Sequence, residues 1–535
     1  MSLSQSSSTS ISKTEHYLWL LLFGLLLLGY LLNLGIQPLY LEEPRRAFIA
    51  MEMLENKNWI VPTLWGQYYY FKPPLFNWIL LASTGLLGGF SEYALRFPTV
   101  VSTWLLSGLL YLIGRKQLGE RHGRYAAALW LCSVGVLFYF SMIAEIDLFF
   151  SLLTFCSIYA IYYFYQKQQL WTLFLVVYTL SALAFLSKGL PALVFTGVSL
   201  LTFFIWKKKF WKLFHPAHFT GFALLILLVG GYFYGYSFYN PPKDYLLTLL
   251  AQSSERTFLG AAWFNFLKHL FLFPLDFAKE LLPALFLLPF LINKSSWESL
   301  RQHEFLTFCA LMLVFNLVPY WLSPGTRMRY VYMLLPFGIF ILVGLWKNME
   351  SQDQNTKWPQ RLFLGFTSLP VVLLPLGSLA ILFVPDLDFL SYRWFLSIGT
   401  FLIFCGLAYG FFRFPQWRML FLLCALAIGR ILFDLSILPQ RVVDSGAQRN
   451  KAFAYELFEE IGNNPLTIVG DEKILSYTST FYLDRLRKKV IRAESKPVFQ
   501  SGHYYIISVS DIPAAAKILH TYEYEDAERA IILME

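Results

Sequence analysis

Two adjacent glutamates followed by two arginines form the most chemically suggestive group in the sequence. Residues 41–54 read LEEPRRAFIAMEML, so Glu42 and Glu43 precede Arg45 and Arg46 with one proline between the pairs. The proline, the acidic start and the apolar stripe that follows predict a surface helix that begins here. A carboxylate at such a point can serve as a general base. The alternative is that the glutamates only cap the helix and pair with the arginines.

Isolated cations recur in other loops and suit the binding of phosphate. Lys72 precedes two prolines in FKPP (residues 71–74), which hold the backbone extended and restrict where the ammonium points. Arg327 and Arg329 stand one residue apart and suit bidentate contacts with phosphate or pyrophosphate. For each cation the alternative is simple contact with lipid headgroups.

Further charged residues stand at the edges of apolar stretches. Glu145 and Asp147 open a long apolar segment, where a carboxylate needs a partner, and Arg45 or Arg46 is the obvious candidate. Loops further along add the cations Lys188 and Arg256. His269 is a candidate metal ligand, although a lone histidine among aromatic residues more often packs or hydrogen-bonds.

The elements that must position these residues are membrane helices. The chain has 535 residues, of which 57% are hydrophobic and only 14% charged, against about 25% charged in soluble domains. A bilayer core of about 30 Å needs roughly 20 apolar residues per helix. Thirteen segments meet that description: 17–35, 95–114, 125–143, 146–165, 170–186, 190–206, 219–238, 275–293, 304–322, 330–346, 362–384, 392–411 and 419–438.

The distribution of positive charge predicts the orientation of these spans. Lysines and arginines at 115–124 and 207–212 fall on the cytoplasmic side if the N-terminus is also cytoplasmic. Counting the apolar segment 75–89 as a span would reverse this, so we interpret it as interfacial or re-entrant. The first outer loop then covers residues 36–94, and thirteen spans place the C-terminus outside. Because the net charge of +9 is spread over short loops, we do not expect nucleic acid as a partner.

The last part of the chain reads differently from the rest. From Val443 onward, helix-like and strand-like patterns alternate, as in LTIVG (residues 466–470) and YYIISV (residues 504–509). We therefore divide the chain into a membrane domain, residues 1–442, and a small soluble α/β domain, residues 443–535, on the outer face.

In sequence order, the motifs resemble a known group of enzymes. EEPR at 42–45, FKPP at 71–74, Asp147, SKGLP at 187–191 and RMRY at 327–330 resemble the bacterial aminoarabinose transferases of lipid A and, more remotely, the protein O-mannosyltransferases. These belong to the GT-C superfamily of glycosyltransferases. The resemblance implies a GT-C fold of about 13 transmembrane helices with a periplasmic cavity and a C-terminal periplasmic domain.

The resemblance also implies roles for individual residues. Glu42 stands where the family has a catalytic aspartate, with Glu43 as the second candidate; Arg45 would pair with Asp147. Phe71 replaces an acidic metal ligand, so a metal is not required and a divalent cation stays open. The candidates are, as catalytic residues, Glu42, Glu43 and Asp147; as substrate-binding residues, Arg45, Arg46, Lys72, Lys188, Arg256, Arg327, Arg329 and Tyr330; and as a metal ligand, His269.

The activity implied is transfer of a sugar from a polyprenyl (undecaprenyl) phosphate donor at the periplasmic face of the bacterial inner membrane. We expect an inverting reaction on a cell-envelope acceptor, which could be lipid A, another glycolipid, a glycan or a protein. The cations would neutralise the phosphate that leaves. The alternative is a transporter or flippase of lipid-linked saccharides, which would need a similar cavity.

Overall fold

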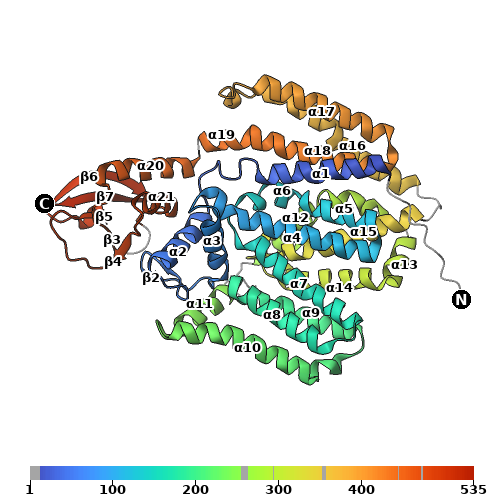
Figure 1. The fold of residues 1–535 in the computed structure, drawn as a ribbon, viewed down its shortest axis with the longest axis horizontal. Helices are drawn as coiled ribbons and strands as arrows, with labels where there is room; N and C mark the ends of the chain where they lie inside the picture. The colour runs from blue at the N-terminus through green and yellow to red at the C-terminus, as the bar shows by residue number, and fades with distance from the viewer. Residues whose placement is uncertain (1–11, 255–262, 293, 352–356, 444, 471–473) are drawn as a thin grey trace.

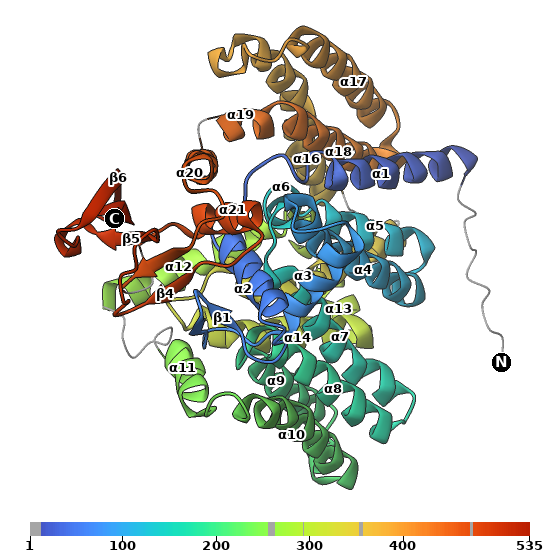
Figure 2. The ribbon, with the colours of Figure 1, turned by 60° about the vertical axis from the view of Figure 1, so that its left-hand side comes forward.

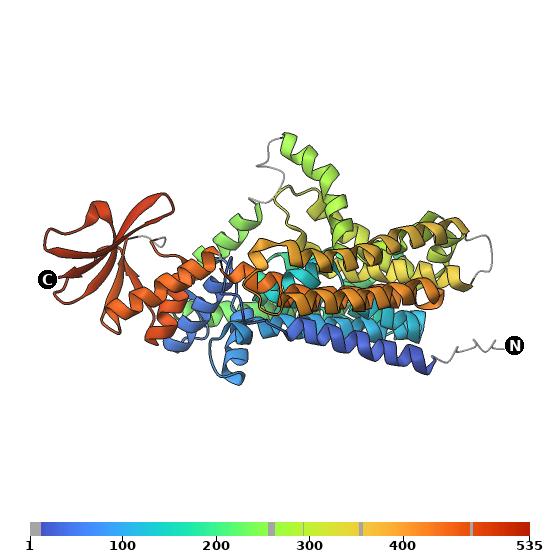
Figure 3. The ribbon, with the colours of Figure 1, turned by 90° about the horizontal axis from the view of Figure 1, so that it is seen from above.

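The computed structural model describes residues 12–254, 263–292, 294–351, 357–443, 445–470 and 474–535. Long helices form a bundle, and a small α/β unit stands at one end of it (Figure 1). Helix α1 begins at the opposite end of the bundle from this unit, as the view in Figure 3 also shows. The molecule is therefore elongated along the direction of its long helices.

Within the described residues, ten helices are long and apolar enough to cross a membrane, and an eleventh span results if the bent pair α5 and α6 is counted as one. This length and composition make the chain a multi-pass membrane protein. The α-helices that contribute to these spans are α1 Lys13–Leu31, α4 Glu92–Leu118, α5 Glu120–Leu131, α6 Val134–Phe138, α7 Ile146–Gln166, α8 Leu170–Lys188, α10 Pro216–Ser237, α14 Glu304–Trp321, α15 Leu335–Ser351, α16 Lys357–Ala380, α17 Arg393–Arg413 and α18 Arg418–Leu435.

Two of the thirteen predicted spans do not reach that length. Segment 190–206 forms α9 (Pro191–Trp206), which has 16 residues. Segment 275–293 is divided between the end of α12 (Trp263–Glu280) and a 3-10 helix at Ala284–Ile292. Pro283 and Pro289 lack the N–H groups that a continuous α-helix needs there, a local effect that hydropathy does not register.

Shorter helices complete the bundle and the end of it that lies next to the α/β unit. Segment 75–89 contains α3 (Leu75–Leu86), whose 12 residues extend about 18 Å, less than the thickness of the hydrocarbon core. The remaining helices are α2 Glu43–Glu55, α11 Lys243–Ser254, α13 Lys294–Gln302, α19 Ile437–Val443, α20 Gly446–Ile461 and α21 Tyr477–Arg487.

A five-stranded sheet forms the centre of the α/β unit. Its strand order is β4-β3-β5-β7-β6, with β3 parallel to both of its neighbours and β7 antiparallel to both of its own. Buried Leu457, Ile468, Phe481, Ile506 and Ile531 fill the space between sheet and helices. The strands are β3 Leu466–Val469, β4 Arg492–Glu494, β5 Tyr504–Ser508, β6 Ala516–Tyr524 and β7 Ala527–Met534.

The α1–α4 segment (residues 32–91) holds the α/β unit against the bundle. Helix α21 packs on α2, and the two lie side by side in Figure 2. A hairpin of β1 (Thr63–Leu64) and β2 (Gln67–Tyr68) follows α2. Its two turn residues, Trp65 and Gly66, have φ of 52° and 79°, the left-handed backbone of a type I′ turn. The Trp65 carbonyl accepts a hydrogen bond of 2.9 Å from the Ala493 amide of β4.

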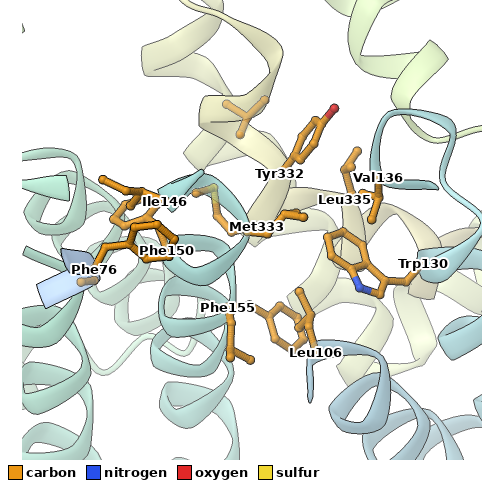
Figure 4. Packing of buried hydrophobic residues seen from close by; sticks show 14 of the residues in the cluster. Phe76, Leu106, Trp130, Val136, Ile146, Phe150, Phe155, Tyr332, Met333 and Leu335 are labelled. Carbon is orange, nitrogen blue, oxygen red and sulfur yellow. The ribbon is translucent and has the colours of Figure 1, made fainter. Parts of the chain in front are cut away.

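Apolar packing fixes the helix ends that carry the charged residues. Figure 4 shows Ile146 and Phe150 of α7 beside Phe76 of α3, with Met333 close by on the 3-10 helix Met328–Leu334. All four side chains are buried. Since a close-packed interior resists displacement, the starts of α7 and of this 3-10 helix keep a fixed distance from α3.

Candidate active site

A cavity of 230 Å³ is lined by residues of α2, of the start of α7 and of other elements. In Figure 1, α2 lies at the end of the bundle next to the α/β unit. The cavity wall comes from separate parts of the chain: the α1–α4 segment, the starts of α7 and of the 3-10 helix, and the ends of α8 and α11. The lining residues are Glu42, Arg45, Arg46, Phe71, Lys72, Ile146, Asp147, Lys188, Gln252, Arg327, Arg329 and Tyr330. Every candidate substrate-binding residue that lies in the described part of the chain is among them.

Positive charge dominates this lining. Six lysines and arginines face only two carboxylates, those of Glu42 and Asp147. Glu145 lies just behind the wall and offsets one more cation. A concave site with such an excess of positive charge attracts an anion and holds it in a setting where charge interactions are strong. A phosphate group matches this charge and the forked geometry of the arginines.

The two adjacent glutamates have different surroundings. The Glu42 side chain is 35% exposed, lines the cavity and pairs with Arg45. Glu43 is fully buried and accepts two hydrogen bonds from Arg96, of 2.8 and 2.9 Å, and one of 2.6 Å from the Ala144 amide. Glu43 thus joins α2 to α4 and to the segment before α7. Of the pair, only Glu42 can reach a ligand in the cavity.

The predicted pairing of Arg45 with Asp147 is wrong. Arg45 pairs with Glu42, and its neighbour Arg46 contacts the residue just before α7, through Nε and Nη2 at 3.0 and 2.8 Å from Glu145. Successive residues of a helix point about 100° apart, so only Arg46 faces α7. Burial opposes the charge of Arg46, but Glu145 outweighs it and raises the pKa of the guanidinium.

Asp147 lies between two other cations. Its carboxylate pairs with Lys188 and stands 3.7 Å from Nε of Arg329, whose Nη1 is 3.3 Å from Glu145. The ammonium of Lys188 also lies 4.5 Å from the ring centre of Tyr330. The side chain of Asp147 is only 4% exposed. Its role in the structure is therefore to hold the cations Lys188 and Arg329 at the cavity wall.

Lys72 projects from a rigid turn. Pro73 and Pro74 are buried, and Pro74 caps the start of α3. The ammonium is 3.4 Å from Oε1 of Gln252, near the end of α11. Sequence reasoning missed Gln252 and the apolar wall residue Ile146, since neither carries a charge that would distinguish it from its neighbours.

Besides the buried Glu43, two further candidates are not among the residues that line the cavity. Arg256 lies outside the described residues. His269 is on α12, with Nε2 3.3 Å from the carbonyl of Tyr320 and its ring packed on Phe273. Within the described ranges, no three His, Cys, Asp or Glu side chains are grouped as a metal ion would need, so His269 has a hydrogen-bonding role there and no companion ligands.

Comparison with known proteins supports the resemblance seen in the motifs. Residues 71–232 match the family model described as dolichyl-phosphate-mannose-protein mannosyltransferase. The chain is also similar to two proteins named undecaprenyl phosphate-alpha-4-amino-4-deoxy-L-arabinose arabinosyl transferase. That of Pseudomonas savastanoi pv. phaseolicola is 27% identical over 62% of each chain. That of Pseudomonas paraeruginosa is 26% identical over 68% of this chain and 65% of the relative. The chain thus matches less than two thirds of either relative's length.

Solved structures extend the similarity over the whole chain. ArnT from Cupriavidus metallidurans, in a crystal structure bound to undecaprenyl phosphate, superposes with a TM-score of 0.69 at 15% identity, covering 98% of this chain and 99% of that chain. Its apo form gives 0.66, covering 97% and 98%.

The superposition and the long apolar helices define the class by its fold: this is a multi-pass membrane protein with the GT-C fold, which it shares with ArnT. The resemblance expected from the ordered motifs is confirmed. Within this class, the chain is similar to the bacterial aminoarabinose transferases.

Proposed function

We propose that this protein transfers a sugar from a polyprenyl phosphate to a cell-envelope acceptor at the periplasmic face of the bacterial inner membrane. The observation that carries the proposal is the cavity in which the Glu42 carboxylate stands among six cations. The names of the sequence relatives and the undecaprenyl phosphate bound to the similar protein ArnT support the donor class. The cations of the cavity can bind the phosphate of that donor. The partly exposed carboxylate of Glu42 can accept a proton from the acceptor.

The reaction is a single displacement at the anomeric carbon. An acceptor oxygen forms the new bond to that carbon while the bond to the phosphate oxygen breaks, and the electron pair leaves with the lipid phosphate. Glu42 takes the proton of an acceptor hydroxyl, or orients the acceptor if its oxygen belongs to a phosphate. Lys72, Arg327 and Arg329 stabilise the negative charge that develops on the leaving group. One displacement inverts the anomeric configuration.

In the proposed orientation, the cavity lies on the periplasmic side of the inner membrane. Helix α4 begins at Glu92, which pairs with Lys451 and Arg485 of the α/β unit, and ends beside Arg115 and Lys116. Its 27 residues extend about 40 Å, so the basic end lies across the membrane from the unit. The N-terminus is then cytoplasmic, and residues 443–535 form a periplasmic domain attached to a membrane domain of residues 1–442.

The test is covalent transfer by purified protein. Protein in liposomes receives radiolabelled undecaprenyl phosphate sugar and an envelope lipid extract, and mass spectrometry follows the acceptors. We expect a labelled, heavier acceptor with the wild-type protein and none with Glu42→Gln. Movement of labelled donor across the bilayer without any labelled acceptor would overturn the proposal and favour the transporter.

A further inference from the structure

The α/β unit contributes an aromatic ring to the surroundings of the cavity. Tyr477 is the first residue of α21, and its ring centre lies 5.8 Å from the guanidinium carbon of Arg45. The ring of Tyr69, from the α1–α4 segment, is 5.7 Å from the same carbon. Both distances fall within the range of cation–π attraction. Arg45 in turn pairs with Glu42, so Tyr477 and Glu42 contact the same guanidinium.

The ring of Tyr477 is itself held in place. It stacks on Trp65, with ring centres 5.1 Å apart and planes 18° apart. Trp65 is only 1% exposed and packs edge-on against Phe48 of α2. Ser476 caps α21 by accepting a 3.0 Å hydrogen bond from the Ser479 amide. Both the backbone and the ring plane of Tyr477 are therefore fixed relative to α2, the helix that carries Arg45.

Hydrogen bonds also tie α21 to the chain just before Glu42. Thr478 donates to the carbonyl of Leu39 at 3.3 Å. The amide of Leu39 donates to the Tyr482 hydroxyl at 2.9 Å, and that hydroxyl donates to Glu92 at 2.8 Å. Consequently α21 and the segment that leads into Glu42 must move together.

We propose that Tyr477 is a positioning residue of the transferase site, which makes the α/β unit a working part of the catalytic machinery. An arginine that is 23% exposed has several rotamers open to it, and a phosphate or the carboxylate of Asp147 could draw its guanidinium away from Glu42. The rings of Tyr69 and Tyr477 keep the guanidinium beside Glu42, and this fixes the direction of the carboxylate. The proposal rests on the proposed function.

Two substitutions of Tyr477 distinguish the contribution of its aromatic ring from the contributions of side-chain volume and of the hydroxyl group. Tyr477→Phe keeps the ring and should keep wild-type turnover. Tyr477→Leu keeps apolar volume but has no π face, and we expect kcat to fall about 5- to 30-fold with little change in KM for the undecaprenyl phosphate sugar. The control is Phe453→Leu, which removes a ring packed on Tyr522 in the same unit, away from the cavity lining, and should leave kcat unchanged.

A double-mutant cycle tests whether the effect passes through Arg45. If it does, Tyr477→Leu should cost little further activity in an Arg45→Ala background. Equal losses in both backgrounds, or a Phe variant as impaired as the Leu variant, would overturn the proposal. So would unchanged kcat in Tyr477→Leu while Glu42→Gln is inactive. Failure of the proposed function itself would look different, since the wild-type protein would then form no labelled acceptor.

Discussion

Arg46 and Glu145 form a buried ion pair that joins α2 to the residue just before α7, with Nε and Nη2 of the arginine 3.0 and 2.8 Å from one carboxylate oxygen. The other oxygen of Glu145 is 3.3 Å from Arg329. One carboxylate therefore positions two cavity cations that are almost 300 residues apart in the chain.

Glu145→Gln should destabilise the protein because it leaves buried Arg46 without its counter-charge. Removing one partner of a buried pair costs about 3 to 5 kcal/mol. The measurement is thermal unfolding in detergent. The matched control is Glu120→Gln, whose partners Arg115 and Arg124 lie in a more exposed cluster and which should cost under about 1 kcal/mol. Equal shifts in the two variants would contradict the importance of burial.

Glu42→Gln and Glu43→Gln should affect different properties: the first should lower the transfer rate, and the second should lower stability. We expect Glu42→Gln to lower transfer about 100- to 10,000-fold, as loss of a general base does, without changing the unfolding temperature. Glu43→Gln should mainly lower stability, because Arg96 would keep its buried position without a full counter-charge. Transfer assays and unfolding curves on the same preparations check both. An active Glu42→Gln enzyme would refute the assignment of the base.

Lys72→Gln should slow the step in which phosphate leaves. Loss of one group that stabilises developing charge typically lowers the rate by about 100-fold or more, and we expect that loss in kcat/KM for the donor. Lys243→Gln is the comparison, since Lys243 is an exposed lysine at the start of α11. Similar kinetics for the two variants would show that Lys72 acts only through general surface charge.

Glu52 should make stability depend on pH near neutrality. Burial raises the pKa of this carboxyl to about 7, although hydrogen bonds from Thr63 and Gly66 oppose the shift. Because the folded pKa exceeds the unfolded value, its stabilising contribution is complete below about pH 4.5 and is lost as pH rises through 7. A shift of this size corresponds to roughly 3 kcal/mol.

The test compares the unfolding temperatures of the wild-type protein and Glu52→Gln at about pH 5 and about pH 8, on either side of the folded pKa. The wild-type protein should lose more stability than the variant between these values. An identical loss in both proteins would mean that Glu52 is ionised in the folded state throughout this range.

Much of the site could be predicted because charges stand out in an apolar chain. Glu42, Lys72 and Arg329 were conspicuous for that reason, and all three line one cavity. Pairing could not be predicted, since a rotation of one residue along α2 decides whether Arg45 or Arg46 meets Glu145. Tyr477 lies some 430 positions from Glu42 in an ordinary polar helix, so only the packing of the two segments revealed its contact with Arg45.

The membrane fold was predictable to the extent that hydropathy determines it. The long apolar helices occur where they were expected. Of the two spans that fall short, one is interrupted at Pro283 and Pro289, and the other, α9, has only 16 residues. The position of α21 against α2 depends on hydrogen bonds such as that from Thr478 to Leu39, for which the sequence contains no local pattern.

The hydrogen bond from Ala493 to Trp65 also protects one edge of the five-stranded sheet. Strand β4 lies at an edge of its sheet, and an open edge offers amide and carbonyl groups to any extended chain nearby. Here the turn of the β1–β2 hairpin occupies one of those groups and covers the strand. The α/β unit produced without the α1–α4 segment would expose that edge, and we expect it to form β-type aggregates.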